Sequence, residues 1–138
     1  MDFKIEKKEH WNIKNYNSEE FKLAYKFSQL IVKEMPGLLQ SVVLFGSSAR
    51  KDNTVRPQDI DVLLLVNDVS IILTPEVSQT FRIITEKVAG RISDRFHINT
   101  MKLSNFWDYA RNGDPIAVNM LRDGVPLYDI GVFEPVQQ

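Results

Sequence analysis

The chain has 138 residues, of which 43% are hydrophobic and 25% charged, and its formal net charge is -1. This composition is typical of one folded globular domain and excludes a largely disordered chain. The near-neutral charge balance excludes the basic footprint of a general nucleic-acid binder. Cysteine is absent, which excludes disulfides and cysteine-ligated zinc sites.

No apolar run approaches the ~18 residues that span a bilayer. The longest such run, residues 60–66, is interrupted by Asp61. Residues 1–8 alternate in charge and lack the apolar stretch of a signal peptide. We therefore expect a cytoplasmic protein with no membrane partner.

The predicted elements begin with a helix over residues 17–35, where apolar side chains recur at helical spacing before Pro36-Gly37. Residues 38–45 are rich in valine and leucine and predict a buried strand. Residues 59–66 predict a second strand that is apolar on both faces and therefore central in its sheet. About a dozen residues separate the two strands, which is short for a crossover helix, so we expect the strands to lie side by side.

In the second half of the chain, Thr74-Pro75-Glu76 predicts a helix start with a capping threonine and a proline in the first turn. Its apolar stripe continues to Ile92. Further along, the pattern predicts a strand over 96–103, short helices over 104–111 and 114–123, and a final strand over 125–128. Within the first short helix, we expect Trp107 and Tyr109 to cover the sheet rather than to stack on a nucleobase.

This order predicts an α/β (α+β) domain with a small mixed β-sheet flanked by helices, and not a Rossmann unit. We expect the domain to occupy residues 17–130. Residues 1–16 form an N-terminal extension in this interpretation. Residues 131–138 form a C-terminal tail in this interpretation, and a further segment could follow this tail.

A first chemical motif follows the first strand, where the sequence reads Gly46-Ser47-Ser48-Ala49-Arg50. Glycine lets the backbone turn tightly and approach a ligand. The next residues are suited to begin a helix, whose free N–H groups bind phosphate. Ser47 and Ser48 add hydroxyl donors and Arg50 adds a positive charge, so this turn is a candidate nucleotide-binding element.

A second motif, Asp59-Ile60-Asp61, opens the second strand. Side chains two residues apart on a strand share a side, so the two carboxylates lie with Cα atoms roughly 7 Å apart. Two like charges in that position favour a cation between them. Mg²⁺ accepts carboxylate and phosphate oxygens together, which predicts metal-assisted phosphoryl or nucleotidyl transfer.

Together the motifs resemble the DNA-polymerase-β-like nucleotidyltransferase superfamily, particularly its minimal single-domain prokaryotic members, over roughly residues 38–129. The resemblance implies a nucleotidyltransferase fold that binds a nucleoside triphosphate with Mg²⁺ or Mn²⁺ and transfers a nucleoside monophosphate. It assigns Gly46 and Ser47 to the phosphates, and Asp59 and Asp61 to the metal ions. It also implies a small helical partner protein, as in toxin–antitoxin-like pairs.

The third motif of that family, a carboxylate on a later strand, is not reproduced. Alignment on Leu103 places Asn99 at the position of the third acid, and His97 shares its face. An amide oxygen can bind a metal but cannot act as a base, whereas histidine can do either.

Three interpretations follow from this site. The first is an active, metal-dependent nucleotidyltransferase that uses ATP and a hydroxyl acceptor. The second is a degenerate, non-catalytic domain that binds nucleotide or a partner, as an antitoxin would. The third is an unrelated α/β domain in which the acids are structural.

Overall fold

The computed structural model of the protein describes residues 18–45 and 59–130. The order of elements in these ranges is α1 (Ser18–Glu34), β1 (Leu39–Phe45), β2 (Ile60–Val66), α2 (Pro75–Ile92), β3 (Phe96–Lys102), α3 (Leu103–Arg111), α4 (Pro115–Asp123) and β4 (Val125–Asp129). This confirms the predicted order of helices and strands and the mixed α+β fold. The division into an extension, a domain and a tail remains a prediction, because residues 1–17 and 131–138 lie outside the described ranges.

The four strands form one mixed sheet in the order β3-β2-β1-β4. Strand β1 pairs antiparallel with β2 and with β4, whereas β2 pairs parallel with β3. Residues 62–66 of β2 are all buried, on both faces of the sheet. This confirms the prediction that the second strand is central, because a strand covered on both faces is apolar throughout.

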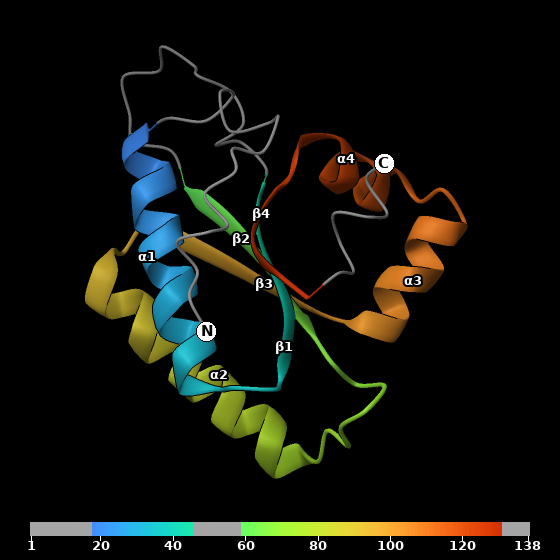
Figure 1. Ribbon diagram of the computed structural model, residues 1–138, viewed down its shortest axis with the longest axis horizontal. Helices are drawn as coiled ribbons and strands as arrows, with labels where there is room; N and C mark the ends of the chain where they lie inside the picture. Colours follow the sequence, from blue (N-terminus) through green and yellow to red (C-terminus); the bar gives the residue numbers. More distant parts are fainter. Residues whose placement is uncertain (1–17, 46–58, 131–138) are drawn as a thin grey trace.

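Two layers of helices enclose the sheet (Figure 1). On one face, α1 and α2 pack on alternate strand residues that include Val42, Leu44, Val62 and Leu64. On the other face, α3 and α4 pack on the intervening residues through a smaller core of Val43, Leu63, Leu65, Phe106 and Met120. The described helices include none that is long and apolar enough to cross a membrane.

Phe106 is the aromatic ring of α3 that packs on the sheet, and it is fully buried. The prediction that Trp107 and Tyr109 cover the sheet is therefore wrong. Their side chains are 43% and 45% exposed. The helix of nine residues turns only one face towards the strands, and that face carries Phe106.

The helix starts show one expected and one unexpected cap. Thr74 accepts a hydrogen bond from the Val77 amide at 3.1 Å, as predicted for α2. No side chain caps α3 from Lys102, the residue before the helix. Instead Asp68, which follows β2, accepts hydrogen bonds from the Ser104 amide at 3.0 Å and the Ser104 hydroxyl at 2.5 Å.

These bonds change the ionisation of Asp68. Burial raises the pKa of its carboxyl, but the hydrogen bonds from Ser104 outweigh burial and hold that pKa below its ordinary value of 3.8. The carboxylate at the start of α3 also lies at the positive end of the helix dipole. Asp68 thus fastens α3 to the end of β2.

The start of β3 is fixed by Arg95. Its guanidinium forms an ion pair with Glu20 of α1, whose side chain is 9% exposed. The Arg95 carbonyl accepts a hydrogen bond of 2.9 Å from the Ile60 amide. One residue therefore holds α1, β2 and β3 together and sets the alignment between the two parallel strands.

Candidate functional site

Asp61 lies near the start of β2, on the face of the sheet that α3 and α4 cover further along. Its neighbours Ile60 and Val62 are fully buried in the core beneath α1 and α2. Side chains alternate along a strand, so the Asp61 carboxylate projects from the opposite face, and its side chain is 15% exposed. Asp59 comes directly before the strand and is exposed.

The parallel alignment of β2 and β3 places His97 opposite Asp61. The two side chains are in contact, with His97 Nδ1 3.0 Å from Asp61 Oδ1. A carboxylate only accepts hydrogen bonds, so in a neutral imidazole this contact puts the proton on Nδ1 and leaves Nε2 as the acceptor. The imidazole is 62% exposed, and its outer nitrogen is accessible to a substrate.

Asn99 lies two residues further along β3, on the same face as His97. It pairs with Leu63, which belongs to the core under α3 and α4. The side chain of Asn99 is exposed. The face that carries Asp61 therefore also carries the two predicted residues of the third strand.

The predicted phosphate turn lies outside the described residues, so Gly46, Ser47, Ser48 and Arg50 remain predictions. The described part of β1 ends at Phe45, which pairs with Asp61 across β1 and β2. Strand β1, which precedes the predicted phosphate turn in the sequence, thus ends beside Asp61.

The donor chemistry of these residues fits Mg²⁺ or Mn²⁺. Carboxylate oxygens of Asp59 and Asp61 and the amide oxygen of Asn99 are hard ligands of the kind that such ions prefer. Within residues 18–45 and 59–130, no three histidine, cysteine or acidic side chains gather as a ready-made metal site. Phosphate oxygens and water complete the shell of Mg²⁺ in many nucleotide sites, so a small set of protein ligands is compatible with this ion.

Sequence reasoning missed the contact between His97 and Asp61. The period of two correctly placed His97 and Asn99 on one face, but it carries no information about the neighbouring strand. A helix between two strands signals that they are parallel. Their alignment, and with it the partner of Asp61, depends on tertiary contacts such as those of Arg95.

Three comparisons relate this chain to known proteins. No match is found among curated proteins. Among solved structures, one similar chain comes from a toxin–antitoxin crystal structure with AMP-PNP, at 16% identity and a TM-score of 0.47, covering 78% of this chain and 74% of that one. Another comes from a mutant of the toxin–antitoxin MntA-HpeT, at 14% identity, with the same TM-score and coverage.

A protein-family model described as "Nucleotidyltransferase domain" matches residues 25–109, which is more than half of the chain. The matched region contains the predicted phosphate turn, strand β2 with Asp61, and strand β3 with His97 and Asn99. The chain therefore belongs to the nucleotidyltransferase domain family.

Proposed function

We propose that this domain transfers a nucleoside monophosphate from a nucleoside triphosphate, ATP in particular, to a hydroxyl acceptor on a partner protein. Membership of the nucleotidyltransferase family supports the class of reaction. The observation that carries the proposal is the contact of Asp61 with His97 on the exposed end of one sheet face. A small helical protein is the partner that the family resemblance implies.

Each residue of the site has a distinct task in this proposal. The turn at Gly46-Ser47 binds the triphosphate, with Ser48 and Arg50 as further phosphate contacts. Asp61 holds His97 in the form with a proton on Nδ1, so Nε2 can accept the proton of the attacking hydroxyl. His97 thereby takes over the proton transfer that Asn99 cannot perform.

Asp59 and Asp61 would hold the divalent ion, with the Asn99 oxygen as a neutral ligand. The bound ion would neutralise phosphate charge and stabilise the leaving pyrophosphate. Asp61 has two carboxylate oxygens, and its contact with His97 uses Oδ1. Asp61 can therefore position His97 through one carboxylate oxygen and bind the metal ion through the other.

A second candidate is a non-catalytic domain that binds nucleotide or a partner protein, as an antitoxin would. Asn99 favours it, because this residue stands where the resemblance predicts a third carboxylate. One fewer negative charge weakens the binding of a second metal ion. This candidate retains triphosphate binding but has no turnover.

The test is transfer of label from ATP labelled at the α-phosphate, with Mg²⁺ or Mn²⁺, to protein in a cell extract and to the purified chain. We expect labelled protein with the wild type and none with Asp61→Asn. Asp108→Asn is the matched control, because this aspartate is 61% exposed on α3, where it pairs with Arg111 and not with a residue of the proposed site. His97→Gln is expected to lower turnover by at least about a hundredfold while ATP binding by calorimetry is retained.

The results separate the candidates. Binding of ATP without label transfer, together with activity gained by Asn99→Asp, would establish the non-catalytic domain. If neither the wild type nor any of these variants binds ATP, Asp59 and Asp61 are structural residues. Transfer that is insensitive to Asp61→Asn would contradict the assigned site.

A further inference from the structure

The outer edge of β3 presents backbone groups that no described strand uses. In the sheet order β3-β2-β1-β4, β3 is an edge strand. The Ile60 amide bonds the Arg95 carbonyl at 2.9 Å, and successive residues of a parallel strand direct their backbone groups to alternate sides. Residues 95, 97, 99 and 101 therefore face β2, whereas Ile98 and Thr100 direct both N–H and C=O outwards.

A groove runs along this edge between α2 and α3. It encloses about 620 Å³. Its walls include Val77, Phe81 and Thr85 of α2, Ile98 and Thr100 of β3, and Tyr109 of α3. The two residues with outward backbone groups thus also line the groove, so an occupant meets an open strand edge and apolar side chains together.

Thr85 gives an independent sign of a missing partner. Its side chain is 5% exposed, yet its hydroxyl has no hydrogen-bond partner in the structure. A buried hydroxyl without a partner costs about 1–3 kcal/mol. Thr85 lines the groove, but its hydroxyl is closed off from solvent, so a polar atom of an occupant satisfies it only after the side chain turns towards the groove.

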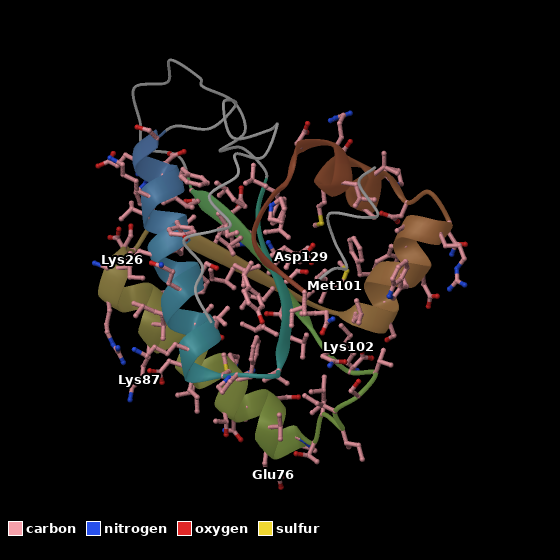
Figure 2. The ribbon with its side chains drawn as sticks, in the orientation of Figure 1. Lys26, Glu76, Lys87, Met101, Lys102 and Asp129 are labelled. Carbon is pink, nitrogen blue, oxygen red and sulfur yellow. The ribbon has the colours of Figure 1, made fainter. Side chains whose placement is uncertain are left out.

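The charges at the groove favour an acidic occupant. Arg82 and Lys102 contribute two positive charges to its lining, and Glu86 contributes one negative charge. Figure 2 shows Lys102 with Met101 where β3 ends beside the start of α3. The lining therefore carries an excess of one positive charge, and Lys102 places one of its two positive charges at the end of the edge strand.

We propose that an extended peptide segment of a partner protein adds to the outer edge of β3 as a fifth strand of this sheet. Its backbone pairs with Ile98 and Thr100. Its side chains point alternately towards Phe81 of α2 and Tyr109 of α3, and an acidic side chain lies near Arg82 and Lys102. Strand addition of this kind takes affinity from main-chain hydrogen bonds and specificity from alternate side chains.

This groove adjoins the proposed catalytic site at Asn99, which lies between Ile98 and Thr100 on β3. It extends away from Asp61, because Val66 in its wall lies five residues beyond Asp61 on β2, which is about 16 Å along a strand. The peptide pairs with the outer edge of β3, whereas the contact of His97 with Asp61 joins β3 to β2, so a peptide at the edge does not displace that contact. The proposal does not depend on catalysis.

The test selects binders of the full chain from a phage-displayed library of random heptapeptides. We expect the enriched peptides to alternate apolar and other residues, to include an acidic residue and to exclude proline from the centre. In NMR hydrogen exchange with a synthetic copy of the best peptide, the amides of Ile98 and Thr100 should slow at least about tenfold. The amides of His97 and Asn99, which already bond β2, should change little.

Two substitutions at position 100 form a matched pair. Thr100→Pro removes an outward N–H that β2 does not use, which an edge strand tolerates, and should weaken peptide binding at least about tenfold. Thr100→Val keeps the N–H and should retain binding. Thermal unfolding checks that both variants fold. If Thr100→Pro does not fold, Thr85→Val tests the groove in its place, because Thr85→Val should also weaken peptide binding.

Three outcomes would overturn the proposal. One is selection of no peptide whose binding depends on Thr100 or Thr85. Another is protection of all four β3 amides to the same degree, or of none. The third is protection of Ile98 and Thr100 that rises with protein concentration without peptide, which would identify a second copy of this chain as the occupant.

Discussion

Replacement of Phe106 by alanine should remove the main link between α3 and the sheet. The side chain is fully buried and belongs to the smaller core with Val43, Leu63, Leu65 and Met120. A buried phenylalanine truncated to alanine costs about 3–5 kcal/mol, from lost transfer energy and the cavity left behind. Folded domains are stable by only about 5–15 kcal/mol, so this single change should consume a large part of the stability.

The assay is urea unfolding followed by far-UV circular dichroism, with thermal unfolding in parallel. For a chain of this size, the expected loss lowers Tm by about 10–20 °C. Trp107→Ala is the matched control, because the neighbouring ring is 43% exposed and its loss should cost less than about 1 kcal/mol. Equal losses for the two variants would refute the assignment of Phe106 as the ring that packs on the sheet.

Three further predictions concern single side chains. Asp68→Asn should cost about 1 kcal/mol at neutral pH in urea unfolding, because the amide cannot accept both hydrogen bonds from Ser104 on separate oxygens. The lowered pKa of Asp68 stabilises the fold above the ordinary value of 3.8, and protonation removes that contribution, so a difference that persists well below pH 3.8 would contradict the role of its charge. Glu20→Gln should cost about 1–3 kcal/mol, because it removes the negative charge from the ion pair with Arg95; a thermal melt unchanged from wild type would contradict this. Thr85→Val should leave the stability of the free protein unchanged or raise it by up to about 1 kcal/mol, because it removes a buried hydroxyl without a partner. The control Thr80→Val replaces an exposed threonine and should change stability by less than about 0.5 kcal/mol. A clear loss of stability in Thr85→Val would show that the Thr85 hydroxyl is bonded in solution.

The local elements were predictable because their signals are local. The spacing of apolar residues along α1 and the Thr74-Pro75 start of α2 depend on residues within one or two turns of each other. The apolar residues on both faces of β2 indicated that a layer of helices would cover each face of this strand. In the same way, the period of a strand placed His97 and Asn99 on one face.

Trp107 shows where local patterns stop being informative. Three aromatic residues lie within four positions of α3, and any of them could have faced the sheet. Phe106 does so because Asp68 bonds Ser104 in the first turn of the helix, and that bond helps to set the rotation of the helix against the strands. Asp68 and Ser104 are 36 residues apart, so no short window of sequence contains this information.

The sequence by itself determined the type of each element, the central place of β2 and the chemical character of the Asp59-Ile60-Asp61 strand, since these follow from nearest neighbours and strand period. Only the tertiary structure decided that His97 contacts Asp61 and that Ile98 and Thr100 face an edge with which no described strand pairs. Both depend on the alignment of β2 with β3, which Arg95 helps to hold through Glu20 and the Ile60 amide. A shift of one residue would turn other side chains to that face, and this choice is made by contacts between distant parts of the chain.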